Sequence, residues 1–155
     1  MLRTKIYIGA DSAGFVIKQG LIEALREEGY DVTDCGTDSE ASCHYPDFAH
    51  AVCANVQKEP DTSFGILVCG TGIGMSMAAN KHRGIRAALC SETYSARFTR
   101  MHNNANVLCM GARVIGPGLA KDITDLFLST EFEAGGRHEA RVDMITAIEK
   151  NEYNA

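Results

Sequence analysis

The sequence lacks the cysteine spacing of a structural zinc site. Its six cysteines include no CxxC pair, and the shortest separation between two of them is eight positions. Such spacing fits neither a zinc ligand set nor the disulfide framework of a small secreted domain. Cys35, Cys69, Cys90 and Cys109 lie in or beside apolar runs, where a free cysteine behaves as a small hydrophobic residue. We therefore expect reduced thiols and no metal site.

Other absences narrow the class of protein. No run of residues is long and apolar enough to span a membrane. Gly9 and Asp11 interrupt the first apolar run, which argues against a signal peptide. Positive charge is not in excess, because the formal net charge is −5, and this argues against non-specific binding to nucleic acid. A chain of 155 residues predicts one domain, and we expect it in the cytoplasm.

The usual nucleotide-binding motifs are also missing. The glycines of GTGIG, residues 70–74, do not follow the GxGxxG pattern, and no GK[ST] comes after them. This turn follows the third expected strand rather than the first. The pattern therefore argues against a bound dinucleotide or nucleoside triphosphate.

What the sequence does contain is a regular alternation of strand-like and helix-like segments. Apolar runs predict strands at 5–10, 30–35, 63–69, 85–90 and 106–110. Helical spacing and Pro or Gly boundaries predict helices at 15–28, 46–58, 75–81, 92–102, 119–130 and 137–150. Such alternation is typical of an α/β fold with a parallel sheet covered on both faces, where ligands bind at the carboxyl ends of the strands.

The turn after the third expected strand is one candidate site. Gly70, Gly72 and Gly74 alternate there before a helix-like segment. Such a turn exposes backbone N–H groups that can hold an anion, although an ordinary turn would also explain the glycines. Cys69 closes the strand beside this turn. It is either a buried core residue or a thiol that the helix N-terminus activates as a base.

Three polar residues near the ends of elements have two interpretations each. His102 can cap the helix at 92–102 or, if it lies near the strand ends, act as a general acid or base. Asn103 can be a helix C-cap or bind a substrate hydroxyl or an oxyanion. Asp11 can cap the helix that follows it or bind a sugar hydroxyl.

A pair of arginines opens the last expected helix. Arg137 and Arg141 stand at positions i and i+4 and so share one face. Two guanidinium groups one turn apart suit a phosphate, and a bound anion would hold cations at a helix end where the dipole disfavours them. A solvated charged face is the alternative. Arg113, just past the fifth strand, is placed to join them.

Five motifs, in order along the chain, resemble the type B ribose-5-phosphate isomerase family, which includes galactose-6-phosphate and allose-6-phosphate isomerases. They are YPDFA at 45–49, CGTGIGMSMAANK at 69–81, GIRAALCSE at 84–92, HNNANVLCMGARV at 102–114 and GGRHEARV at 135–142. The resemblance implies a single domain over 1–155 with a Rossmann-like three-layer α/β/α sandwich and a five-stranded parallel sheet. It also implies no metal or cofactor, and a homodimer or tetramer in which the last helix, about 137–150, packs at the dimer interface.

The resemblance also implies a role for each matching residue. The base would be Cys69, and ring opening would fall to His102 with Thr71. The enediolate oxygen would be bound by Gly70, Gly72, Ile73, Gly74 and Asn103. Sugar hydroxyls would be bound by Asp11, Ser12 and Tyr45, and phosphate by Arg113, Arg137, His138 and Arg141.

Three positions bear on how far the resemblance extends. Met75 stands where some branches of the family have a glutamate base, so the chain matches the cysteine branch. Ser12 stands where the family usually has histidine, and this weakens one contact at the polar end of the substrate. His44 stands where many members have aspartate.

The expected reaction is the interconversion of D-ribose 5-phosphate and D-ribulose 5-phosphate through a cis-enediol, in the non-oxidative branch of the pentose phosphate pathway. One alternative is an isomerase of allose 6-phosphate or galactose 6-phosphate. Another is a non-catalytic domain that binds a phosphorylated ligand, but that alternative gives no reason for Cys69, His102 and the paired arginines to occur together. The expected partners are a sugar phosphate and a second copy of the chain, without nucleic acid or membrane.

Overall fold

The computed structural model describes residues 5–154, which form one five-stranded sheet and six helices. Residues 1–4 and 155, which the expected domain includes, lie outside the described part. The strands are β1 (Lys5–Ala10), β2 (Asp31–Asp34), β3 (Ser63–Cys69), β4 (Ala87–Leu89) and β5 (Val107–Gly111). Every pairing is parallel, and the strand order is β2-β1-β3-β5-β4. The predicted five-stranded parallel sheet is confirmed.

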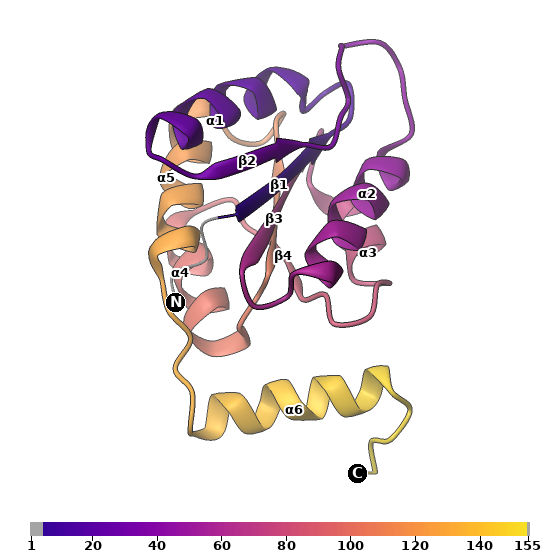
Figure 1. Cartoon of the computed structure of the whole chain (residues 1–155), viewed down its shortest axis with the longest axis vertical. Helices are drawn as coiled ribbons and strands as arrows, with labels where there is room; N and C mark the ends of the chain where they lie inside the picture. Colours follow the sequence, from indigo (N-terminus) through magenta and orange to yellow (C-terminus); the bar gives the residue numbers. More distant parts are fainter. Residues whose placement is uncertain (1–4, 155) are drawn as a thin grey trace.

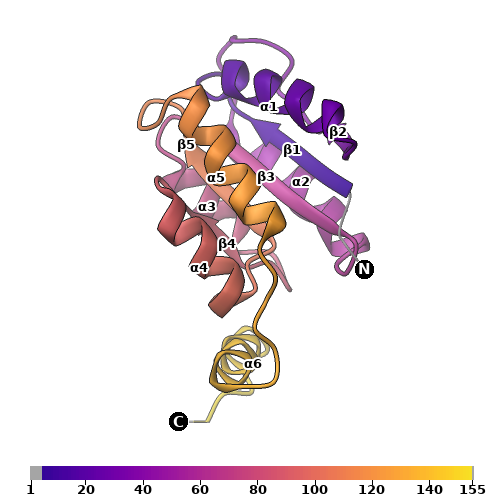
Figure 2. The ribbon, with the colours of Figure 1, turned by 90° about the vertical axis from the view of Figure 1, so that its left-hand side faces the viewer.

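Helices cover both faces of this sheet (Figures 1 and 2). They are α1 (Phe15–Glu27), α2 (Tyr45–Lys58), α3 (Ile73–Ala79), α4 (Thr93–Asn103), α5 (Pro117–Ser129) and α6 (Arg137–Glu149). Helices α1, α4 and α5 pack on one face, and α2 and α3 pack on the other. The predicted Rossmann-like three-layer sandwich is therefore confirmed. Within residues 5–154, no helix has both the length and the apolar character needed to cross a membrane.

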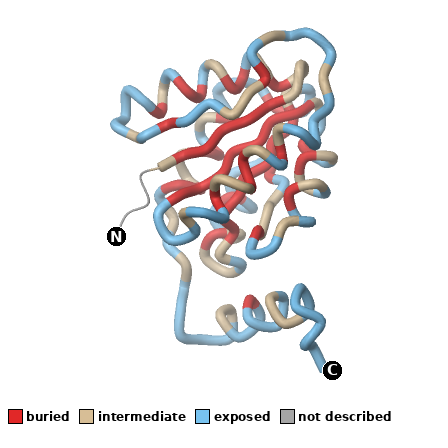
Figure 3. The backbone as a smooth tube through the Cα atoms, turned by 45° about the vertical axis from the view of Figure 1, so that its right-hand side comes forward, coloured by how far each residue is buried: buried red, intermediate tan, exposed pale blue. Residues whose placement is uncertain are grey.

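The sheet divides the core into two clusters of buried side chains. Strand β3 lies at the centre of the sheet, and all seven of its residues are buried (Figure 3). Ile66 and Val68 pack toward α1 and α5, whereas Leu67 and Cys69 pack toward α2 and α3. Burial on both faces explains why this strand is a continuous apolar run. The same run carries Cys69 to the carboxyl end of the sheet.

Helix α6 lies outside the sandwich (Figures 1 and 2). Val142 is its only buried residue among those described. The Glu149 carboxylate accepts hydrogen bonds from the Gly84 N–H at 2.9 and 3.0 Å, which ties the end of α6 to the loop before β4. Met144 and Ile148, four residues apart and so on one face, are 45% and 57% exposed. The helix therefore presents apolar surface that residues 5–154 leave exposed.

The observed elements differ from the predicted ones mainly at their ends. Helix α3 begins at Ile73 rather than at residue 75, because Gly72, with φ of 78°, turns the chain directly into the helix. Strand β4 covers 87–89 of the predicted 85–90, and as an edge strand it pairs with β5 alone. Helix α5 begins at Pro117, two residues early, because proline fits the first turn of a helix.

Candidate active site

The thiol of Cys69 forms the inner wall of the turn that follows β3. Its residue is 5% exposed, and its sulfur accepts a hydrogen bond from the Gly72 N–H at an N···S distance of 3.1 Å. The next N–H, that of Ile73, donates to the Thr71 hydroxyl at 3.3 Å. Successive backbone donors therefore point toward the side of the turn that carries Cys69 and Thr71, which is the arrangement of an anion-binding nest.

Close packing fixes the conformation of this turn. Gly72 has φ of 78°, and a Cβ there would lie 2.4 Å from Cδ1 of Leu89 and 2.9 Å from the Met110 backbone. A Cβ on Gly74 would lie 2.6 Å from the Tyr45 ring, so that ring covers the start of α3. Glycine is required at 72 on both conformational and steric grounds. The turn is a rigid part of the sandwich rather than a loose loop.

Other predicted binding residues lie at the same end of the sheet. The Arg113 N–H donates to the Gly70 carbonyl at 2.9 Å, and its guanidinium nitrogen lies 3.5 Å from where a Gly70 Cβ would stand. The Asp11 carboxylate accepts from the Gly14 N–H at 3.1 Å, so it closes the turn that starts α1. Asp11 and Ser12 are both half-buried. We call residues 11, 12, 45, 69–74 and 113 the carboxyl-end group.

His102 and Asn103 lie at the opposite end of the sheet. Helix α4 starts beyond the carboxyl end of β4 and runs antiparallel to it, so its last residues come back to the amino end. The Asn103 carbonyl accepts from Nε of Arg86, the residue directly before β4, at 3.1 Å. The nine residue-to-residue steps from Thr93 to His102 rise about 14 Å along a helix. His102 is therefore about that far from the carboxyl end of the sheet, where Cys69 lies.

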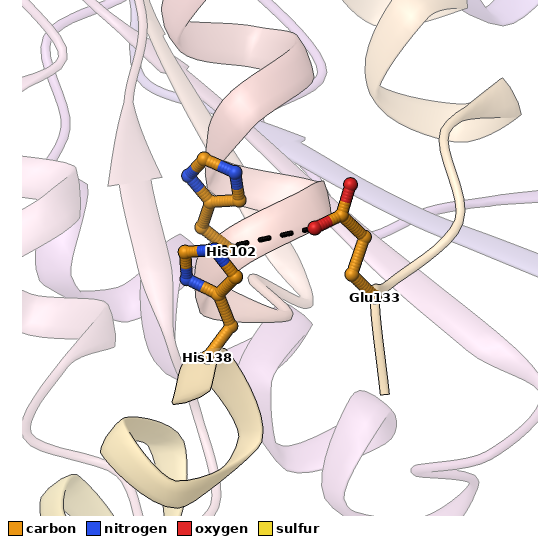
Figure 4. Close-up of side chains that lie close together, drawn as sticks. All are labelled: His102, Glu133 and His138. Carbon is orange, nitrogen blue, oxygen red and sulfur yellow. Dashed lines mark ion pairs between the residues drawn. The ribbon is translucent and has the colours of Figure 1, made fainter. Parts of the chain in front are cut away.

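Helix α6 brings three further predicted site residues, Arg137, His138 and Arg141, close to His102. The His102 and His138 rings are stacked, with centroids 3.8 Å apart and planes 3° apart (Figure 4). Nε of Arg137 lies 3.5 Å from Nε2 of His138. Asn103 and Arg141 line a cavity of about 440 Å³ together with both histidines. We call these five residues the histidine–arginine group.

The electrostatics of this group centre on His138. Desolvation lowers the pKa of His138 below its usual 6.5, and the nearby His102 and Arg137 lower it further. The lowered pKa favours the neutral ring at pH 7. Positive charge for an anion comes instead from the exposed Arg137 and Arg141.

The structure corrects two expectations about placement. His102 does not lie near the strand ends with Cys69, because α4 carries it to the other end of the sheet. Arg113 does not join Arg137 and Arg141, because it lies against Gly70 at the carboxyl end. Within one chain the predicted site residues thus form two separate groups. The predicted order of parallel strands and connecting helices already implies this end for His102, because a helix between two parallel strands ends at the amino end of the sheet.

Three other cysteines behave as core residues. Burial raises the pKa of Cys53 to about 12 and that of Cys90 to about 11, and it holds the pKa of Cys109 well above 9. These thiols stay protonated at neutral pH, which agrees with the interpretation of Cys90 and Cys109 as small hydrophobic residues and extends it to Cys53. All six cysteines are free in the structure.

Sequence reasoning missed one side chain beside the histidines. Glu133 lies in the segment between α5 and α6, and its Oε2 is 4.0 Å from Nε2 of His138. Its backbone N–H donates to the Met101 carbonyl at 3.0 Å, which holds it next to His102. No motif marks Glu133, because its contact with Met101 joins two segments about 30 residues apart in the sequence.

Comparison with known proteins decides the family. The model of the ribose/galactose isomerase family matches residues 6–145. The chain belongs to the ribose/galactose isomerase family. Among its relatives is ribose-5-phosphate isomerase B of Escherichia coli K12, 49% identical over 146 residues that cover 94% of this chain and 97% of that protein. The family assignment predicted from the five motifs is confirmed.

Two further members of the family bear on the substrate. D-erythrulose-4-phosphate isomerase of Pectobacterium atrosepticum is 49% identical over 132 residues, covering 84% of this chain and 86% of the relative. The crystal structure of ribose-5-phosphate isomerase B from Mycoplasma genitalium has ribulose 5-phosphate bound. It matches this fold with a TM-score of 0.91 at 42% identity, covering 94% of this chain and 96% of that one.

Proposed function

We propose that this protein interconverts D-ribose 5-phosphate and D-ribulose 5-phosphate. The observation that carries the proposal is the Cys69 thiol, held against the backbone donors of a glycine turn at the carboxyl end of a parallel sheet. Membership of the ribose/galactose isomerase family supports an aldose–ketose isomerase. The relatives named ribose-5-phosphate isomerase B support a five-carbon substrate.

In the proposed reaction Cys69 moves one proton between two carbons. Its thiolate removes the proton from C2 of the open-chain aldose, and the electron pair shifts to the C1 oxygen to give an enediolate. The same proton returns to C1, while the proton of the C2 hydroxyl passes to the C1 oxygen before the ketose forms. The turn at 70–74 stabilises the oxygen charge where it develops, and losing one such donor typically costs about 3 kcal/mol. His102 opens the sugar ring before this step.

Two copies of the chain are needed to complete each proposed site. The carboxyl-end group supplies the base and the oxyanion donors, whereas the histidine–arginine group supplies the ring-opening histidine and two arginines for the phosphate. One chain holds them at opposite ends of its sheet. A symmetric dimer brings the first group of one chain to the second group of its partner, and so forms two equivalent sites. The uncovered apolar face of α6 with Met144 and Ile148 suits the dimer interface.

A four-carbon sugar phosphate is the second candidate substrate, because one relative at 49% identity is a D-erythrulose-4-phosphate isomerase. Purified protein mixed separately with ribose 5-phosphate, erythrulose 4-phosphate, allose 6-phosphate and galactose 6-phosphate, and followed by NMR, distinguishes the candidates. The proposal requires the highest kcat/KM with ribose 5-phosphate. A higher kcat/KM with another sugar phosphate would make that sugar phosphate the substrate. Binding of a sugar phosphate without turnover of any of the four would favour the non-catalytic alternative.

The cytoplasm is the proposed location of this reaction. Free thiols at all six cysteines support a reducing compartment, because thiols that face an oxidising environment tend to pair. Fractionation of the source cells, with the protein followed by an antibody, tests this part of the proposal.

A further inference from the structure

Three metal-ligating side chains from three segments converge in the histidine–arginine group. They are His102 near the end of α4, Glu133 in the segment before α6, and His138 in the first turn of α6. One ligand atom from each lies within 4.8 Å of the others, and Figure 4 shows the carboxylate beside the stacked rings. The backbone hydrogen bond from Glu133 to the Met101 carbonyl, at 3.0 Å, holds the Glu133 backbone next to His102. The three residues are thus brought together by the fold and not by chance rotamers alone.

The chemistry of this set selects one class of ion. Two imidazoles and a carboxylate, with a fourth position open, are a ligand set of catalytic zinc sites. In a tetrahedral site with bonds near 2.05 Å, neighbouring ligand atoms are about 3.3 Å apart. The observed Oε2 to Nε2 distance between Glu133 and His138 is 4.0 Å. Because the two imidazole planes are stacked 3° apart and each nitrogen lone pair lies in its own ring plane, one imidazole must turn out of the stack before both can bind one ion. Magnesium and calcium prefer oxygen ligands and do not fit two imidazoles.

We propose that His102, Glu133 and His138 bind a divalent transition-metal ion such as Zn²⁺, and that the bound ion inhibits the enzyme. Metal coordination would take the ring nitrogens that the reaction needs on His102 and His138. The inhibition rests on the proposed function, whereas the binding of the ion does not. Arg137 and Arg141 oppose the cation but attract an anion to its open position.

The binding test uses a conservative variant and a matched control. Zn²⁺ binding is measured by titration calorimetry on the purified full chain, with Mg²⁺ as the negative ion. Glu133→Gln removes the carboxylate charge, and we expect at least tenfold weaker binding of Zn²⁺. Glu131→Gln changes an exposed glutamate two residues away in the same segment, and we expect unchanged binding. His138→Gln removes an imidazole and should weaken binding at least as much as Glu133→Gln.

The inhibition test compares the same glutamate variants with ribose 5-phosphate as substrate. We expect Glu133→Gln to keep kcat/KM without added metal within about twofold, and to need at least tenfold more Zn²⁺ for half inhibition. A wild-type chain without isomerase activity would contradict the proposed function, while the calorimetry would still decide whether the metal site exists.

Thiols also bind Zn²⁺, and a further variant tests whether the thiol of the proposed base contributes. Cys69→Ala removes the thiol nearest the proposed chemistry, and we expect its Zn²⁺ affinity to equal that of the wild type. The proposal is overturned if wild-type protein fails to bind micromolar Zn²⁺, if Glu133→Gln and His138→Gln both bind it as the wild type does, or if Cys69→Ala alone abolishes binding.

Discussion

The two groups of site residues are built in different ways. The carboxyl-end group is a backbone structure, in which β3 and the packed glycines at 72 and 74 leave little freedom. The histidine–arginine group consists of side chains, and three of its five members belong to a helix with one buried residue, Val142. The fold of one chain therefore determines the first group by itself. The second group depends on how α6 is held, and in the proposed dimer a partner chain would cover the exposed face of α6.

The largest expected effect is the loss of the base in the carboxyl-end group. Cys69→Ala should lower kcat by about 10²–10⁴-fold, the range that general acid–base catalysis contributes, with substrate binding retained. Cys43→Ala, at a half-buried cysteine outside both groups, is the control and should leave kcat unchanged. Initial rates with ribose 5-phosphate and calorimetric binding provide the two measurements. Unaltered turnover in Cys69→Ala would remove Cys69 as the base.

The next largest effect is a loss of folding free energy, which should be greater in the rigid turn at 70–74 than in the segment that leads to α6. Gly72→Ala should cost about 2–5 kcal/mol of folding free energy, because the left-handed conformation and the close contact with Leu89 both oppose a Cβ. Gly135→Ala, with φ of 83° but open space around the Cβ, should cost about 1–2 kcal/mol. Urea denaturation of both variants measures the difference. Equal losses would mean that packing around the turn contributes nothing beyond conformation.

A smaller effect concerns the uncovered face of α6. Met144→Glu places a charge on this face and should raise the dimer dissociation constant at least tenfold, because burying an unpaired charge is costly. Lys150→Glu changes the charge at the C-cap of the same helix and serves as the control. Analytical ultracentrifugation over a range of protein concentrations gives both constants. A Met144→Glu dimer as stable as the wild type would place the interface elsewhere.

The difference between the two groups also explains which parts of the fold and of the site the sequence predicts. Strand β3, the turn at 70–74 and the order of elements are local features, so apolar runs and glycines are enough to predict them. The shared family motifs then supply candidate roles for Cys69 and His102. The separation of His102 from Cys69 also follows from the predicted parallel sheet, because α4 joins two parallel strands and so ends at the amino end of the sheet. The contact of Glu133 with His138 depends on the return of the chain after α5, which no periodicity encodes.

Each proposed active site combines the carboxyl-end group of one chain with the histidine–arginine group of its partner. Cys69→Ala and Arg137→Ala chains, each nearly inactive alone, are denatured together in equal amounts and refolded. Random pairing makes half of the dimers mixed, and each mixed dimer then contains one intact site out of two. If the sites are shared between chains, about a quarter of wild-type activity returns. Activity no higher than the mean of the two separate variants would show that each chain forms its own site, and would contradict the proposal of shared sites.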